Sequence, residues 1–168
     1  YATMDGDTCG GLSPIAGIDK AFLRRWVVWL ERTAPEGMRS VPALAAVSAL
    51  APTAELKPHA AAQTDEKDLM PYDVLDAIER GAIRDKRSPV EIFTVLRGTF
   101  PSHRAHDLKH WIARFFRLWC RNQWKRERYA PSFHLDDESL DPKTWCRFPI
   151  LSSGYETELQ ALLALPDA

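Results

Sequence analysis

The stretch QTDEKDLMPYDVLD, residues 63–76, contains several acidic residues close together, followed by Pro71 and a segment with apolar residues at helical spacing. It predicts an acidic loop that leads through the proline into a helix with an apolar face. Just upstream, PTAELKP at residues 52–58 sets Thr53 and Lys57 between two prolines. Proline fixes its own φ and restricts the residue before it, so both ends of this segment are stiff. We interpret the region as a preset loop carrying a hydroxyl, carboxylates and an ammonium, which suits a site where phosphate and metal meet.

The length, composition and charge of the chain limit the classes of protein to which it can belong. The chain has 168 residues, about one domain, and 45% of them are apolar, enough to form a core. Its net charge of −1 favours neither nucleic acid nor a membrane surface. Cys9, Cys120 and Cys146 form no CxxC pair, which argues against zinc and fits a reducing compartment. Because no apolar run approaches ~18–20 residues and no signal peptide is visible, we expect a cytoplasmic protein.

The first half of the chain predicts helices joined by turns. Residues 1–15 resemble the end of a strand followed by a glycine-rich loop. Asp19 is placed to cap a helix over residues 20–30, in which Phe22, Trp26 and Trp29 recur at helical spacing and are predicted to be core. Pro35-Glu36-Gly37 predicts a break, and the alanine-rich residues 42–50 a short helix.

The second half also predicts helices, with few alternating patterns that would indicate strands. Helix 72–81 should bury Val74, Leu75 and Ile78 and stop at Gly81. Ser88 and Glu91 form a capping box for the next helix, with Val90, Phe93 and Leu96 on its apolar side and Gly98 and Pro101 at its end. A short helix is expected over residues 155–165.

The longest predicted helix starts at Asp107 and runs to Glu127 or Arg128. Its apolar stripe should be core. Arg114, Arg117, Arg121, Lys125 and Arg128 recur at three- and four-residue steps. A charge pattern of this kind most often indicates a basic helix face that is exposed to solvent. The alternative interpretation is that the end of this helix faces a phosphate group. The stripe residues are Leu108, Trp111, Ile112, Phe115, Leu118 and Trp119.

Several spaced motifs together resemble glutamine-dependent NAD synthetase, in the C-terminal part of its synthetase domain. They occur in family order and span nearly the whole chain, and PYxxLD after the acidic loop is the most specific. The motifs are YATMxGDxxGGLxPI (1–15), Lys20, PTAEL (52–56), QTDE (63–66), PYxxLD (71–76), Lys125-Arg126, Pro131 and RFPI (147–150).

The resemblance implies an ATP- and Mg²⁺-dependent ligase that amidates nicotinic acid adenine dinucleotide (deamido-NAD) to NAD. In such enzymes ATP adenylates the substrate carboxylate, and ammonia released from glutamine by a separate glutaminase domain attacks the acyl adenylate. The site must neutralise phosphate charge and keep water from the adenylate. The family is also oligomeric, so a homo-oligomer is expected.

The resemblance also implies roles for individual residues. Lys20 and Thr53 match groups that contact ATP phosphates, and Thr53, Asp65 and Glu66 are the expected catalytic set, the two acids lying in a loop that orders over substrate. No residue is expected to bind a metal by itself. The substrate-binding positions are Tyr1, Ala2, Thr3, Met4, Asp7 and Lys125.

Each of these residues also has an ordinary structural interpretation. Lys20 could be a solvent-exposed residue in the first turn of a helix, Thr53 could cap a helix, and Lys125 could be a surface charge. Asp65 and Glu66 are residue types that are usually solvated in loops. The ordered set of motifs, rather than any single residue, favours the functional interpretation.

The resemblance implies that residues 1–168 are the mostly helical C-terminal portion, with one or two short strands, of a Rossmann-like α/β adenine-nucleotide hydrolase fold. The family's Ser-Gly-Gly-x-Asp-Ser ATP loop, an upstream Glu and the glutaminase domain are not found in this sequence. We therefore expect half an active site that does not turn over by itself. The alternatives are a helical module that uses residues 107–128 to bind nucleic acid or a protein, and an assembly segment.

Overall fold

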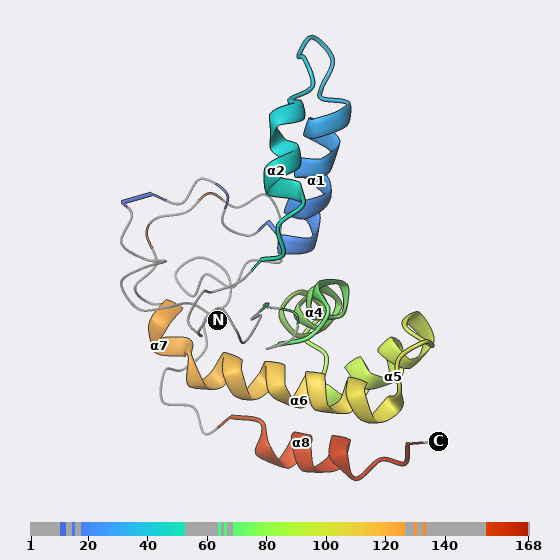
Figure 1. Ribbon diagram of the computed structural model, residues 1–168. Coiled ribbons are helices and arrows are strands. Elements are labelled where there is room, and N and C mark those ends of the chain that lie inside the picture. The colour runs from blue at the N-terminus through green and yellow to red at the C-terminus, as the bar shows by residue number, and fades with distance from the viewer. Residues whose placement is uncertain are drawn as a thin grey trace. The chain divides into compact units, whose positions relative to one another are not determined.

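The computed structural model describes residues 11, 12, 15, 18–52, 64, 66, 69–126, 130, 133 and 154–167. Within these ranges every regular element is a helix (Figure 1), which confirms the mostly helical prediction for this part of the chain. The strand expected near residues 1–4 lies outside the described residues. The chain divides into two compact units, a small unit of residues 19–73 and a large unit of residues 1–18 and 74–168.

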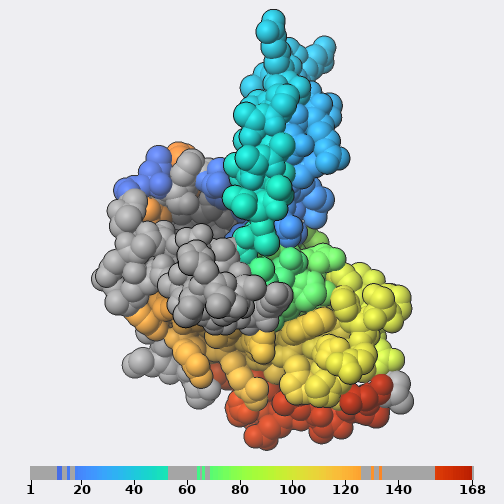
Figure 2. All heavy atoms as spheres, in the orientation of Figure 1, coloured from blue at the N-terminus to red at the C-terminus, as the bar shows by residue number. Residues whose placement is uncertain are grey.

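The small unit is built on helix α1, Lys20–Arg32, which turns back into the 3-10 helix η1, Pro42–Leu44, and the short helix α2, Ala45–Ser48. Asp19 occupies the predicted N-cap position, although its side chain makes no capping hydrogen bond. The predicted break at 35–37 is present, and after it the Val41 N–H donates to the Leu30 carbonyl at 2.9 Å. Figure 2 shows the atoms of α2 lying against α1, as the contacts between these helices require.

The aromatic face of α1 is not core, contrary to the sequence prediction. Phe22, Trp26 and Trp29 are 50%, 44% and 40% exposed, and the buried residue of this helix is Ala21. Helical spacing correctly places the three rings on one face. It does not specify which neighbour covers that face. Among the described helices of the small unit, α1 packs mainly against the short helices η1 and α2.

Helix α4, Tyr72–Glu79, continues directly into a π-helical turn, η3, Arg80–Arg84. Val74 and Ile78 are fully buried as predicted, whereas Leu75 is only half-buried. The predicted stop at Gly81 is wrong, because Gly81 lies buried inside the π-helical turn. A Cβ at this position would lie 3.0 Å from Cγ1 of Ile92, so glycine allows the turn to approach the next helix closely.

This close approach makes Gly81→Ala and Gly98→Ala a matched pair for stability. Both glycines lie within helical segments, but an added Cβ meets nothing within 4 Å at Gly98. We expect Gly98→Ala to raise the free energy of unfolding by about 0.5–1 kcal/mol, since alanine loses less backbone entropy in a helix. At Gly81, overpacking against Ile92 outweighs that gain and costs a net ~1 kcal/mol. Urea unfolding followed by circular dichroism measures both, and a stabilising Gly81→Ala would contradict the packing described.

Helix α5, Pro89–Thr99, begins at the predicted capping box. The Ser88 N–H donates to Oε2 of Glu91 at 2.8 Å, and the Glu91 N–H donates back to Oγ of Ser88 at 3.4 Å. The backbone N–H of Ser88 and its hydroxyl, at 2.7 Å, both donate to the Glu91 carboxylate and hold the pKa of that carboxyl below its usual value. Its buried side is Pro89, Ile92, Phe93 and Leu96, so Val90 is less buried than predicted.

Helix α6, Ala105–Arg121, begins two residues before the predicted start at Asp107. Arg104 occupies the N-cap position and donates to both oxygens of Asp107 at 2.8 and 3.0 Å, which lowers the pKa of that carboxyl. The predicted continuous helix is wrong beyond Arg121. Asn122 ends α6, and a separate short helix, α7, spans Gln123–Arg126.

The apolar stripe of α6 forms the core of the large unit, as predicted for Leu108, Ile112, Phe115 and Trp119. Helix α8, Glu156–Leu163, lies within the predicted range 155–165. It runs antiparallel to α6 (Figure 1) and contacts both α5 and α6. The ring of Phe116 packs edge-on to Tyr155 with centroids 4.7 Å apart, which closes the core between the two helices.

A buried lysine fixes the residues that follow α8. Lys109 is 4% exposed, and its Nζ donates to the Leu165 carbonyl at 2.6 Å and pairs with Oδ1 of Asp167 at 2.7 Å. The hydrogen bond from Lys109 lowers the pKa of the Asp167 carboxyl. A buried charge needs such partners, so Lys109 connects α6 to the segment 164–167.

None of the helices in the described ranges is long and apolar enough to cross a membrane.

Candidate phosphate-binding site

The structure describes three of the residues predicted for the site, namely Lys20, Glu66 and Lys125. Lys20 and Glu66 belong to the small unit and Lys125 to the large unit. The remaining predicted positions, Tyr1, Ala2, Thr3, Met4, Asp7, Thr53 and Asp65, lie outside the described residues.

Two cations from α1 share one aromatic ring. Nζ of Lys20 lies 5.4 Å from the centroid of the Tyr72 ring, and Cζ of Arg24 lies 5.6 Å from the same centroid. Both distances are within the range in which a cation is attracted to a ring face. Tyr72 is 4% exposed, so the ring is a fixed platform, while both cations remain in contact with solvent.

Glu66 supplies the negative charge of the cluster. Its Oε1 accepts the backbone N–H of Tyr72 at 3.2 Å, and its Oε2 lies 3.5 Å from Nη1 of Arg24. The Arg24 and Glu66 side chains are 46% and 42% exposed, so solvent weakens their ion pair. Both contacts use the Glu66 side chain: one joins it to Arg24 on α1, and the other to the backbone N–H of Tyr72, the first residue of α4. We refer to Lys20, Arg24, Glu66 and Tyr72 as the α1–α4 cluster.

The charge of the α1–α4 cluster fits phosphate. Lys20 and Arg24 are four residues apart on one helix, where like charges repel. Glu66 pairs with Arg24, and the side chains of Lys20 and Arg24 both remain exposed to solvent. A phosphate group is the ligand chemistry that two convergent cations favour.

The described residues do not form a metal centre. They include no group of three or more His, Cys, Asp or Glu side chains that could hold a metal ion. Glu66 already uses one oxygen for Tyr72 and the other for Arg24.

Lys125 lies on α7, the short helix after the break at Asn122. Its backbone N–H donates to the Asn122 carbonyl at 3.1 Å, and its Nζ lies 5.8 Å from the centroid of the Trp124 ring. The helix breaks at Asn122, and α7 follows as a separate helix. The prediction that Lys125 continues the basic face of α6 is therefore wrong.

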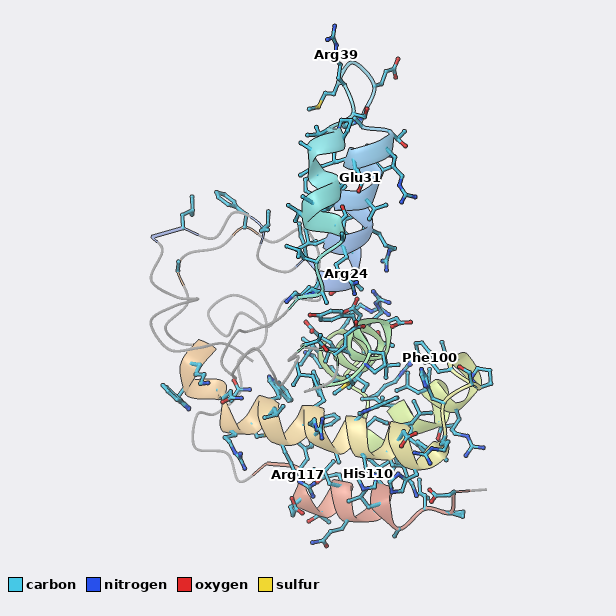
Figure 3. All side chains as sticks on the ribbon, viewed as in Figure 1. Arg24, Glu31, Arg39, Phe100, His110 and Arg117 are labelled. Carbon is cyan, nitrogen blue, oxygen red and sulfur yellow. The ribbon has the colours of Figure 1, made fainter. Side chains whose placement is uncertain are left out.

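The basic face of α6 is partly neutralised. Arg114, Arg117 and Arg121 are exposed, as predicted for a solvated face. Nη2 of Arg117 donates to Oε1 of Glu156 at 3.2 Å, and in Figure 3 this side chain points from α6 toward α8. An intramolecular partner for the central arginine, together with the near-zero net charge, favours a structural role for this face over nucleic-acid binding.

Sequence reasoning missed some polar residues. Arg24 could have been found as the position one helical turn after Lys20 on the same face. Gln123 carries no comparable sequence signal. It is 1% exposed, and neither polar atom of its side chain has a hydrogen-bond partner in the part of the chain that is described.

Comparison with known proteins agrees with the sequence motifs. Residues 1–127 match the NAD synthase family. Two similar proteins are the glutamine-dependent NAD(+) synthetases of Xanthomonas campestris, 32% identical over 155 residues, and Thermotoga maritima, 38% identical over 156 residues. These alignments cover 92% and 93% of this chain and 24% of each relative.

The fold agrees as well. The crystal structure of a glutamine-dependent NAD(+) synthetase from Cytophaga hutchinsonii is similar with a TM-score of 0.73 and 47% sequence identity, over 96% of this chain and 24% of that one. The chain therefore spans about a quarter of the length of the relatives it matches. The predicted resemblance is confirmed: this chain belongs to the NAD synthase family.

Proposed function

We propose that this chain is part of an ATP-dependent ligase that amidates nicotinic acid adenine dinucleotide to NAD, with ammonia derived from glutamine. The observation that carries the proposal is the match to glutamine-dependent NAD(+) synthetases over more than nine-tenths of the chain, in sequence and in structure. The exposed Lys20 ammonium of the α1–α4 cluster supports it independently, since both ATP and the dinucleotide are polyanions.

In this proposal the small unit binds ATP phosphates through Lys20, with Thr53 supplying a hydroxyl from the proline-bounded loop. Asp65 and Glu66 belong to the loop that orders over the substrate. The dinucleotide substrate is bound by Lys125 and by residues 1–4 together with Asp7.

ATP supplies the adenylyl group that makes the substrate carboxylate reactive toward ammonia. The residues of this chain bind the phosphates, orient the carboxylate and keep water from the activated acyl group. The exposed ammonium of Lys20 above the buried Tyr72 ring fits the phosphates of ATP. Because the described residues offer no cluster of metal ligands, Mg²⁺ is best held by the phosphates and by residues beyond this set.

The proposal includes the surroundings of the chain. We place residues 1–168 in the C-terminal portion of a Rossmann-like α/β synthetase domain, joined in the complete protein to a glutaminase domain that supplies ammonia. We further propose a cytoplasmic homo-oligomer.

The test uses the complete polypeptide that contains this chain. Incubated with ATP, Mg²⁺, nicotinic acid adenine dinucleotide and glutamine, it is expected to form NAD, AMP and pyrophosphate in equal amounts. Substrate labelled with ¹⁸O in the carboxylate should transfer one ¹⁸O to AMP, the signature of an acyl adenylate. Failure to form NAD with either glutamine or ammonium would refute the function, and unlabelled AMP would refute the adenylate step.

A further inference from the structure

Glu66 makes two contacts with other residues of the small unit, residues 19–73. The first is the ion pair of Oε2 with Arg24, one turn after Lys20 on α1. The second is the hydrogen bond of Oε1 with the backbone N–H of Tyr72, the first residue of α4. That N–H is one of the donors at the start of a helix that have no partner within the helix, so Glu66 satisfies it from outside.

Both contacts converge on the ring that lies beneath Lys20. Tyr72 is fixed at its backbone by Glu66 and at its ring by two cations, one of which is the Arg24 that Glu66 also binds. The carboxylate also reduces the repulsion between Lys20 and Arg24, which lie four residues apart. Glu66, 46 residues away in the sequence, therefore contacts both Arg24 and Tyr72, whose ring lies beneath the Lys20 ammonium.

We propose that Arg24 and Glu66 form a positioning pair that holds the Tyr72 platform and thereby Lys20 in the geometry for binding phosphate. The proposal rests on the function proposed above and assigns Glu66 a different role from the catalytic one that the sequence predicts. Glu66 acts through Arg24 and Tyr72 rather than on the substrate. Arg24 has no assigned role in the sequence motifs and gains one here.

The contacts of Glu66 favour positioning over chemistry at the metal or the acyl group. Among the described residues, no neighbours of Glu66 complete a set of three metal ligands.

The substitutions Glu66→Gln, Glu66→Ala and Arg24→Gln separate these roles in the complete protein. Glutamine keeps an oxygen for the Tyr72 N–H and loses only the ion pair, whereas alanine loses both contacts. For a half-exposed ion pair we expect Glu66→Gln and Arg24→Gln each to raise KM for ATP about 2- to 5-fold. Losing the hydrogen bond to a charged acceptor as well should bring the effect of Glu66→Ala to about tenfold or more. kcat and KM for the dinucleotide should change little.

Two further measurements define the pair. The double variant Arg24→Gln with Glu66→Gln should be no worse than either single variant, since both remove the same interaction. The pH dependence of kcat should keep the same shape in Glu66→Gln. Arg25→Gln is the matched control, an exposed arginine next to Arg24 on the same helix, and it should leave every parameter unchanged.

The opposite results overturn the proposal. A catalytic or metal-binding Glu66 would make Glu66→Gln as damaging as Glu66→Ala, mainly in kcat, with Arg24→Gln nearly silent. Additive losses in the double variant would show that the residues act separately. A wild-type protein that forms no NAD would instead refute the underlying function, so the two failures are distinguishable.

Discussion

Replacing Phe116 with alanine is expected to lower the free energy of unfolding of the large unit by about 3–5 kcal/mol. Phe116 is 2% exposed and lies at the centre of the aromatic core, with ring centroids 5.5 Å from Phe115, 6.2 Å from Trp119 and 4.7 Å from Tyr155. Truncation removes a buried ring and leaves a cavity between rigid neighbours that cannot collapse into it. Urea unfolding followed by circular dichroism measures the loss.

Val95→Ala is the control for this substitution. Val95 is an apolar residue on α5 of the same unit but is 43% exposed, so its truncation should change the free energy of unfolding by no more than about 0.5 kcal/mol. If Phe116→Ala cost as little as Val95→Ala, Phe116 would not be a core residue and the packing of α6 against α8 would be wrong.

Local signals in the sequence predicted the local structure well. The capping box at Ser88 and Glu91 depends on residues three apart, and the structure forms it as predicted. The stripe of α6 was also predictable, because a helix with apolar residues on one face must bury that face. In both cases the deciding interactions lie within one element or one turn of it.

The errors arise where a second element decides the outcome. The sequence predicted that Gly81 ends a helix, but Gly81 lies inside the π-helical turn. There the absence of a Cβ allows close packing against Ile92 of α5. The aromatic face of α1 looked like core, but exposure depends on which elements pack against it. Periodicity indicates that a face exists, and only the tertiary structure shows what covers it.

For the candidate site, too, the sequence predicted some features and missed others. The family motifs identified Lys20 and Glu66 as residues of interest, but they did not predict that the two meet through Arg24 and Tyr72. The hydrogen bond from the Tyr72 N–H to Glu66 joins residues six apart in the sequence, and the ion pair of Glu66 with Arg24 joins residues 42 apart. Neither separation corresponds to a helix or strand period. The sequence could therefore identify Lys20 and Glu66 as candidate site residues, but it could not predict which residues they contact.

Lys20→Gln is expected to reduce kcat/KM for ATP by about 10²–10³-fold in the complete protein, the loss typical when one donor to a developing negative charge is removed. Glutamine keeps much of the length of lysine and a polar end but removes the charge, so the substitution tests charge rather than packing. Steady-state formation of NAD at varied ATP concentration measures the effect. Because the dinucleotide contacts are proposed to lie elsewhere, KM for that substrate should change much less.

Arg39→Gln is the control for the loss of one positive charge from the small unit. Figure 3 shows Arg39 at the turn between α1 and η1, at the opposite end of α1 from Lys20, and its side chain is exposed. Its replacement should leave kcat/KM for ATP unchanged, and Lys20→Arg should fall between the wild type and Lys20→Gln, since guanidinium keeps the charge but not the shape of ammonium. Equal effects of Lys20→Gln and Arg39→Gln would mean that Lys20 contributes only to the general field of the protein and does not touch phosphate.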